Sequence, residues 1–593
     1  MLFRSEGVRS VQLAADGAGT LNFPLTAAND YATARVRIRV QGNGESVDRS
    51  YDLPVRAAWP SVLRAETRAL EELAPVTVGA DFAQGLMPGS VQAQMSVTAF
   101  PPIPFAAALR GALDYPYWCA EQTASRGYAA LLLDEATVSM LGLEDLDAER
   151  RQRTVQAAFG RLASMQAANG HFSMWGNSGP VDPFLTPYVA EFLLDARDAG
   201  FAVPDGVLQK ALERLNEDLL AGGQEFYGRD HRQYLKLAYQ AHAGFVLARV
   251  NRAPLGTLRT IFDNHSDAAL SGLPLVRLGL ALRLQGDQAR GDRAIAQGFA
   301  LERERPRWLG DWSTPLRDAA MSIALVHEQD AAKPEYTARA IDVGRELDAR
   351  RQQRWMYLST QEQIAIARLG KALAADGTRQ VAGTLRIGGT EEQISGTRIF
   401  GRRFDHADLA AGVRFEPAGE PPFYASLEVA GVPRTAPEAD FSRLKVERQL
   451  YRLDGSAWEP GPLAEGEALI VAVSITADRA MPDALLTDLL PAGLEIENFN
   501  LADAEQWGGV TVQGVNLSER EGAADLQHEE FRDDRYVAAL SLRRGRTARL
   551  FYLVRAVTPG TYTVPPPMVE DMYRPELRGV GRAVPETITV VQP

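Results

Sequence analysis

Residues 115–126 read Tyr-Pro-Tyr-Trp-Cys-Ala-Glu-Gln-Thr-Ala-Ser-Arg and include Cys119, the only cysteine of the 593-residue chain. Gln122 stands three positions after Cys119, so in the first turn of a helix the two side chains project to the same side and come within covalent reach. A thiolate that attacks the Gln122 carboxamide would release ammonia and leave a thioester joining the two side chains. Because an acyl group on a good leaving group is a stored electrophile, such a bond persists only while water and amines are kept away.

Aromatic residues directly precede this pair. Tyr115, Tyr117 and Trp118 are candidates for an apolar cover, since aromatic rings exclude water over a large area. The alternative is that a lone cysteine at a helix start is a small buried hydrophobic residue without a chemical role. A Glu-Gln pair at this offset from a cysteine arises by chance at roughly 1 in 400 from average composition, which favours the chemical interpretation.

The zone that follows this stretch, from about residue 103 to 376, is rich in Ala, Leu, Arg, Gln and Glu. Its apolar residues recur at three- and four-residue spacing, which predicts eight to ten helical segments. A capping-box pattern at Ser359-Thr-Gln-Glu362 marks the start of one of them. Helices paired in this way bury their apolar stripes against neighbours, so we expect a solenoid or a closed ring of helical hairpins.

The zones on either side show strand patterns. Val36, Ile38 and Val40 alternate with arginines, and residues 91–97 alternate in the same way, which predicts half-buried strands. Strand signals return after residue 380, and residues 442–593 predict a β-sandwich-like domain. Since the first strand pattern begins so early, we expect the chain to start inside a β domain and to be part of a longer protein.

Composition excludes several classes of protein. The chain has 63 Lys and Arg against 76 Asp and Glu, a net charge of −13, so nucleic acid is not an expected partner. A single cysteine cannot form an intrachain disulfide. No stretch approaches the ~20 apolar residues that span a bilayer, and the first ten residues lack the features of a signal peptide.

The segment around Cys119 resembles the Cys-x-Glu-Gln thioester motif of the alpha-2-macroglobulin and complement superfamily, and its Tyr-Pro-Tyr start resembles the bacterial branch. Other segments resemble successive landmarks of the family's thioester domain, namely residues 169–175, 186–192, 312–318 and 358–363. Two more resemble its last macroglobulin domain, namely residues 488–498 and 569–575.

This resemblance implies a multidomain α and β fold, in which an α/α toroid thioester domain is inserted in a CUB-like β-sandwich and flanked by macroglobulin-like β-sandwich domains. The implied domains are the end of a macroglobulin-like domain (1–57), the two halves of the CUB-like domain (58–100 and 377–432), the toroid (101–376) and a C-terminal macroglobulin-like domain (440–593).

The resemblance also implies a broad-range endopeptidase inhibitor. In the family, a protease cuts a bait region, the molecule rearranges, and a lysine amine of the protease attacks the exposed thioester. The attacker becomes an amide on Gln122 and Cys119 is released as a thiol, so each molecule reacts once and is not an enzyme. Glu121 is a motif neighbour without a role that we can derive, and Met572 and Tyr573 lie in the segment that covers the thioester in bacterial relatives. Packing within the sandwich is the alternative for these last two.

The implied partners are proteases, attached through lysine amines, and further proteins of the cell envelope. The implied location of the full-length parent is the periplasm, where it could be held as a lipoprotein. No cofactor or metal is implied. The chain lacks a bait region and the long series of macroglobulin domains that precedes the toroid in the family, so we expect it to be the thioester-bearing C-terminal part.

Alternatives from other classes remain open at this stage. His171, His231 and His242 are candidates for a histidine that transfers the acyl group to hydroxyls, as in some family members, although amine reactivity is the default expectation. The chain could also be a non-covalent toroid scaffold whose thioester never forms. Toroids also serve terpene cyclases and prenyltransferases, but neither an Asp-rich motif nor a zinc site is visible around Cys119. A cysteine hydrolase would need a histidine beside Cys119.

Overall fold

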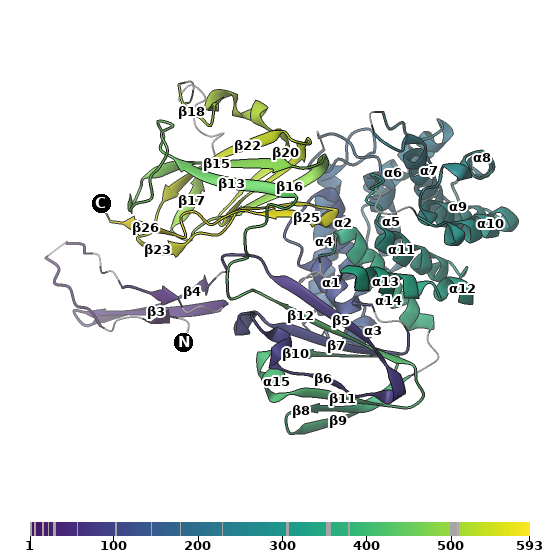
Figure 1. Cartoon of the computed structure of the whole chain (residues 1–593), viewed down its shortest axis with the longest axis horizontal. Coiled ribbons are helices and arrows are strands. Elements are labelled where there is room, and N and C mark those ends of the chain that lie inside the picture. Colours follow the sequence, from purple (N-terminus) through teal and green to yellow (C-terminus); the bar gives the residue numbers. More distant parts are fainter. Residues whose placement is uncertain are drawn as a thin grey trace.

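The computed structural model describes residues 3–592 except for 5–7, 15–16, 20, 22, 28–30, 56, 101–102, 144, 178, 228, 304–307, 351–356, 377–379, 498–506 and 508. The predicted domain boundaries at residues 101 and 377 lie outside the described residues, as does the end of the 488–498 landmark. A helical region, two β-sandwiches and a separate hairpin make up the described parts (Figure 1).

The helical region is a closed double ring. Each inner helix packs on the next, and the last packs back on the first: α2 (Ala120–Leu132), α5 (Leu185–Asp198), α7 (Arg232–Arg249), α9 (Gly272–Leu284), α11 (Pro315–Glu328) and α14 (Thr360–Asp376). Outer helices pack against them: α1 (Phe105–Leu113), α4 (Ala148–Met165), α6 (Asp205–Leu220), α8 (Leu255–His265), α10 (Gln288–Ala300) and α13 (Ala340–Arg350). The predicted α/α toroid is therefore present.

The distribution of apolar residues on a helix indicates whether the helix lies in the inner or the outer ring. In α9, every residue from Leu273 to Leu282 is buried, as expected of a helix surrounded by others. In α4 only one stripe is buried, formed by Val155, Ala158, Phe159, Leu162 and Met165. The described residues between 105 and 376 contain fourteen α-helices, so our expectation of eight to ten was too low. Short helices such as α3 (Glu135–Leu141) and α12 (Pro334–Thr337) carry too few turns to show a period.

One β-sandwich is assembled from segments on both sides of the helical region. Its first sheet has the strand order β10-β7-β12-β5 and its second the order β6-β11-β8-β9. Strands β5 (Val62–Leu70), β6 (Val76–Val78) and β7 (Gln92–Thr98) precede the helices. Strands β8 (Val381–Ile387), β9 (Thr390–Thr397), β10 (Ile399–Phe404), β11 (Val413–Ala418) and β12 (Phe423–Gly431) follow them.

Strand β7 joins this split sandwich to the toroid. The sequence predicts a half-buried strand here, but the structure buries both faces. Met95 and Val97 lie in the sandwich core, while on the opposite face Gln94 donates a hydrogen bond to the Leu141 carbonyl at 2.7 Å. Helices cover the face that the alternating pattern leaves for water, so this part of the prediction was wrong.

A second β-sandwich ends the chain. Its sheets have the strand orders β13-β15-β22-β17, β14-β26-β23 and β20-β21-β16-β24-β25. The first two sheets are formed by β13 (Leu444–Tyr451), β15 (Ala468–Ala477), β22 (Thr547–Ala556), β17 (Leu494–Glu497), β14 (Leu463–Ala464), β26 (Thr587–Val591) and β23 (Gly560–Thr563). The strands that reach the toroid are β16 (Met481–Leu489), β20 (Asp525–Arg532), β21 (Arg535–Leu542), β24 (Met568–Asp571) and β25 (Arg574–Val580). This sandwich lies beside the N-terminal end of α2 (Figure 1). Its separate core contains Leu486, Tyr536 and Val569.

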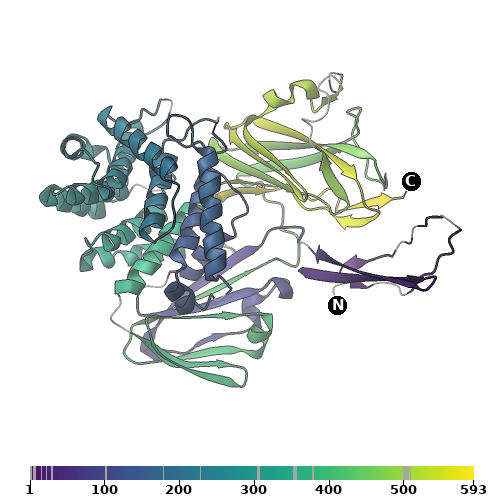
Figure 2. The ribbon, with the colours of Figure 1, turned by 180° about the vertical axis from the view of Figure 1, so that it is seen from behind.

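The N-terminal hairpin pairs β3 (Ala32–Gly42) with β4 (Glu45–Val55) and projects away from the helical ring (Figure 2). The predicted strand over Val36, Ile38 and Val40 is confirmed, but the predicted burial is not, because Ile38 and Val40 are 45% and 59% exposed. Among the described residues, no helix combines the length and apolar character needed to cross a membrane.

Candidate functional site

Cys119 and Gln122 meet at the N-terminal end of α2. Cys119 is the N-cap residue, and its Sγ accepts a hydrogen bond from the Gln122 backbone N–H at 3.4 Å. The Gln122 Oε1 in turn accepts from the Cys119 backbone N–H at 3.2 Å. The pair thus forms a reciprocal capping box with sulfur in place of the usual hydroxyl. This places the thiol and the carboxamide side by side, as the three-residue spacing predicts.

Two side chains of the C-terminal sandwich cover this pair. The Gln122 Nε2 donates to the Met572 Sδ at 3.3 Å, and the Tyr573 hydroxyl lies 3.8 Å from the Met174 Sδ. Cys119 and Tyr573 have no exposed surface, and Gln122 and Met572 are 2% exposed. The site is therefore closed by contacts between two domains rather than by the toroid alone.

Burial makes the Cys119 thiol a weak acid. Its pKa is raised well above the usual value, chiefly by desolvation and further by the charge of Glu121, against hydrogen bonds that favour the thiolate. A thiol with a raised pKa is a poorer leaving group, so the covered site disfavours cleavage of an acyl group from this sulfur.

Glu121 has a positioning role that sequence reasoning missed. Its fully buried carboxylate accepts hydrogen bonds from Ser125 (2.6 Å), Thr360 (2.7 Å) and Gln361 (2.7 Å). Burial nevertheless raises its pKa. Because Thr360 and Gln361 form the first turn of α14, Glu121 ties the start of α14 to the start of α2. The predicted capping box of Ser359 and Glu362 at the same helix end is confirmed, at 3.3 and 3.0 Å.

The three aromatic candidates lie in different surroundings. Tyr115 and Tyr117 pack edge to face with ring centroids 5.6 Å apart, and the Tyr117 hydroxyl hydrogen-bonds to Thr487 of β16. The Trp118 ring instead lies against the guanidinium groups of Arg126 and Arg161, at 4.3 and 5.9 Å. The two tyrosines thus contribute to the closed interface, while the contacts of the Trp118 ring are with arginines of α2 and α4.

None of the three histidine candidates is hydrogen-bonded to Cys119 or Gln122 in the described structure. His171 contacts Thr186 and Asp218, His242 contacts Glu191 at 2.6 Å, and His231 is the N-cap residue of α7. Burial lowers the pKa of His242 to about 4, which keeps its imidazole neutral. In the described residues, no cluster of three or more His, Cys, Asp or Glu side chains is suited to a metal ion.

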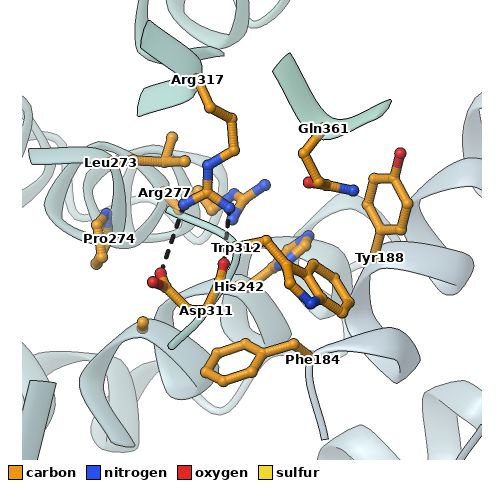
Figure 3. A pocket seen from close by; sticks show the side chains of 11 residues that line it. Phe184, Tyr188, His242, Leu273, Pro274, Arg277, Asp311, Trp312, Arg317 and Gln361 are labelled. Atoms are coloured by element: carbon orange, nitrogen blue, oxygen red, sulfur yellow. Dashed lines mark hydrogen bonds and ion pairs between the residues drawn. The ribbon is translucent and has the colours of Figure 1, made fainter. Parts of the chain in front are cut away.

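A buried polar cluster lies inside the ring next to the site (Figure 3). Arg317 pairs with Asp311 and Asp318, and Arg317 and Asp311 line a small cavity of about 20 Å³. Gln361 lines this cavity and also holds Glu121. Trp312 lines it too, and its ring packs on Tyr573 with centroids 5.4 Å apart. The cluster therefore supports the residues that hold the site.

Comparisons with known proteins agree with this geometry. Residues 444–576 match the family model for the bacterial alpha-2-macroglobulin MG10 domain. The native alpha-2-macroglobulin of Escherichia coli, solved from domain MG7 to the C-terminus, is 32% identical with a TM-score of 0.89, and the match covers all of this chain and 93% of that one. The chain belongs to the bacterial alpha-2-macroglobulin family.

Longer alpha-2-macroglobulins match over 99% of this chain. Those of Xylella fastidiosa (strain 9a5c) and E. coli K12 are 60% and 34% identical, and this chain spans 36% of the length of each. A structure of Salmonella alpha-2-macroglobulin reacted with methylamine is 33% identical with a TM-score of 0.88, and the match covers 100% of this chain and 38% of that one. The family resemblance inferred from the residues around Cys119 is confirmed.

Proposed function

We propose that this chain carries the reactive thioester of a covalent protease trap, formed between Cys119 and Gln122. One observation carries the proposal: the thiol and the carboxamide are held side by side by reciprocal hydrogen bonds, and the pair is sealed by Met572 and Tyr573. An electrophile that must survive in water needs both features, a fixed geometry for its formation and a dry site for its storage.

The cover controls the reactivity. While the C-terminal sandwich is docked, burial keeps the sulfur a poor leaving group and excludes water. If Met572 and Tyr573 move away, water solvates the sulfur, its pKa falls towards the ordinary value, and the thioester becomes both accessible and more reactive. The proposed trigger is a rearrangement that follows proteolysis elsewhere in the longer protein.

The proposed reaction is an acyl transfer. The amine nitrogen of a protease lysine attacks the Gln122 acyl carbon, so a C–N bond forms and the C–Sγ bond breaks. The electron pair leaves with Sγ, which takes up the proton that the amine sheds and becomes the Cys119 thiol. The protease ends as an amide on the former Gln122 side chain, so the chain acts as a single-turnover inhibitor.

The remaining parts of the proposal concern the longer protein. Proteases are the proposed covalent partners, through their lysine amines, and other envelope proteins are proposed as further partners. Family membership supports a periplasmic location and a lipid anchor for the parent protein. The reactive pair supports amines rather than hydroxyls as acceptors, since the candidates His171 and His242 are engaged with other side chains.

The experiment is an intact-mass measurement on fresh protein, paired with a thiol titration before and after methylamine. We expect a mass short by one ammonia and no free thiol, followed by a methylamide and one thiol per chain. Cys119→Ala is the matched control, because it leaves the chain without a thiol and must keep its full mass. A full mass and a reactive thiol in wild-type protein purified under conditions that exclude amines would instead favour the scaffold alternative.

A further inference from the structure

A second, larger cavity lies where the split sandwich, the toroid and the C-terminal sandwich meet. Its volume is about 530 Å³, within the range of ligand pockets. Its wall includes Gly111 of α1, Glu428 of β12, and Tyr115 and Met572 from the cover of the thioester pair. The cavity therefore ends at the side chains that seal the reactive site.

Among the described residues of its wall, the buried polar atoms that lack a hydrogen-bond partner are acceptors. Oε1 of Gln94 and Oε1 of Gln363 are both buried and without a hydrogen bond. The orientation of each carboxamide is fixed by its Nε2 atom. In Gln94 this atom donates to the Leu141 carbonyl (2.7 Å), and in Gln363 it donates to the Leu358 carbonyl (3.2 Å). A carbonyl cannot donate, so the free atom in each side chain is the oxygen. A ligand that suits these positions must donate hydrogen bonds.

The carboxyl groups of the cavity also favour a cation. Arg110 and Arg403, which line the wall, both pair with Asp145. The Glu570 carboxylate has no hydrogen bond or ion pair within 4 Å in the described structure; the nearby Arg578 guanidinium lies over the Tyr357 ring at 4.1 Å. Burial raises the pKa of Glu570, and that of Glu428 to about 7. Among the described charged groups of this wall, Glu428 and Glu570 form no ion pair within 4 Å, and the opposing charges are those of Arg110 and Arg578.

The position of Gln122 indicates how an amine would reach the site. In the product of aminolysis, the incoming nitrogen takes the place that Gln122 Nε2 holds here. That nitrogen now contacts the Met572 Sδ at 3.3 Å. Met572 also lines the large cavity. The side chain of Met572 is therefore a plug between the cavity and the position of the reacting nitrogen.

We propose that this cavity binds small primary amines as ammonium ions and delivers them past Met572 to the thioester, with the Glu570 carboxylate as the group that holds the ammonium and takes its proton. The proposal rests on the proposed thioester. It commits to free small amines because the cavity exists while the domains are docked, when a protease lysine has no access. The wall offers what an ammonium group requires, which is several acceptors and an unpaired carboxylate.

Each atom of the step is accounted for. The ammonium gives one proton to Glu570 and becomes a neutral amine, which attacks the Gln122 acyl carbon. The C–N bond forms, the C–Sγ bond breaks, and Sγ leaves with the electron pair. The nitrogen loses its second proton to Sγ, which gives an amide and the Cys119 thiol. Glu570 then returns its proton to solvent.

The test measures thiol release from the full chain against methylamine concentration, at constant ionic strength. We expect saturation, and competition by trimethylammonium chloride, which has the charge and one N–H donor but, as a tertiary amine, cannot form a stable amide. Glu570→Gln should slow the reaction about tenfold at low methylamine and abolish the competition. Glu586→Gln makes the same change at an exposed site of the same domain. It should leave the reaction rate at low methylamine and the competition unchanged.

A second variant separates binding from reaction. Gln363→Leu removes one acceptor and should raise the half-saturating methylamine concentration several-fold, with little effect on the maximal rate. Both variants should carry the ammonia-deficient mass before methylamine is added, which shows that the thioester forms and stays covered. A linear dependence on methylamine, equal in wild type and Glu570→Gln, overturns the cavity proposal while the thioester stands. Absence of the ammonia-deficient mass in every version overturns the proposed function instead.

Discussion

The two ends of the inner helices differ in chemistry although the same helices form both. At their N-terminal ends, Cys119, Glu121 and Gln122 are buried under a second domain and form no ion pair in the described structure, although Arg317 pairs with Asp311 and Asp318 nearby. At their C-terminal ends, α2, α5, α7, α11 and α14 surround a cavity of about 570 Å³ whose wall carries Arg249 and Arg368. Both arginines pair with carboxylates there.

The helix dipole explains this division. Free backbone N–H groups and partial positive charge at a helix start suit an acceptor such as the Cys119 Sγ or the Glu121 carboxylate. Free carbonyls at a helix end suit cations, and Lys371 donates to the Leu132 carbonyl at 3.3 Å. A stored electrophile is thus placed at the end that another domain can cover, while Arg249 and Arg368 pair with carboxylates in the cavity at the other end. The following predictions test this division, from the largest expected effect to the smallest.

Replacement of Arg368 should cost the most stability. Arg368 lies between Glu191 (2.7 Å) and Glu328 and holds the pKa of Glu191 well below its usual value. Arg368→Met leaves a buried carboxylate without its cation, which costs about 3–5 kcal/mol. Urea unfolding checks this, with the exposed Arg259→Met as control, for which we expect a change below about 1 kcal/mol. Equal losses of stability in the two variants would mean that the buried ion pairs of Arg368 stabilise the fold no more than an exposed pair does.

Removal of the Met572 side chain should affect the site at the N-terminal ends of the inner helices. Met572→Ala deletes the side chain that contacts Gln122 Nε2, at a cost of about 2–5 kcal/mol in a closed site. Thiol release without amine should accelerate at least about tenfold, because water reaches the acyl group. Met568→Ala, at the start of the strand that precedes Met572 and only partly buried, is the control. If Met568→Ala released thiol as fast as Met572→Ala, the contact of Met572 with Gln122 would not be what protects the site.

The covered interface should weaken as the pH rises. Burial, with the nearby charges of Asp571 and Asp182, raises the pKa of Asp483 to about 8, against the opposing influence of Arg229 and Arg574. Between pH of about 4 and 8 the group is ionised in the unfolded chain but protonated in the native one, so the unfolded state binds fewer protons. Stability from this group therefore falls as pH rises through this window and levels off above it.

The variant Asp483→Asn should remove this dependence. We expect it to be more stable than wild type by on the order of 1–3 kcal/mol at pH 8, and to lose that advantage near pH 4. Thermal unfolding across this pH series is the measurement. A constant difference between the two proteins at every pH would contradict the assignment.

The smallest effect is expected for an exposed ion pair at the C-terminal ends of the inner helices. Lys371 pairs with Asp134 at 2.7 Å and is 36% exposed, so Lys371→Met should lower stability by less than about 1 kcal/mol. The difference should shrink in high salt, since a solvent-exposed pair is screened. Thermal unfolding at low and high ionic strength measures both, and a large salt-independent loss would contradict a solvent-exposed pair.

Local spacing determined much of this protein. The i, i+3 placement of Cys119 and Gln122 predicts side chains that meet at a helix start, and the capping box at Ser359 predicts the start of α14, because both patterns act within one turn of backbone. Apolar periods predict a helical zone between two β zones, since the periodicity of each element depends on neighbouring residues only.

Tertiary structure alone decided what surrounds these elements. Thr360 and Gln361 hold Glu121 from about 240 positions away in the chain, and Met572 covers Gln122 from 450 positions away. No local period encodes such contacts. The same reason explains the errors over β7 and over Ile38 and Val40: an alternating pattern tells which residues share a face, but the packing of domains decides whether that face meets water.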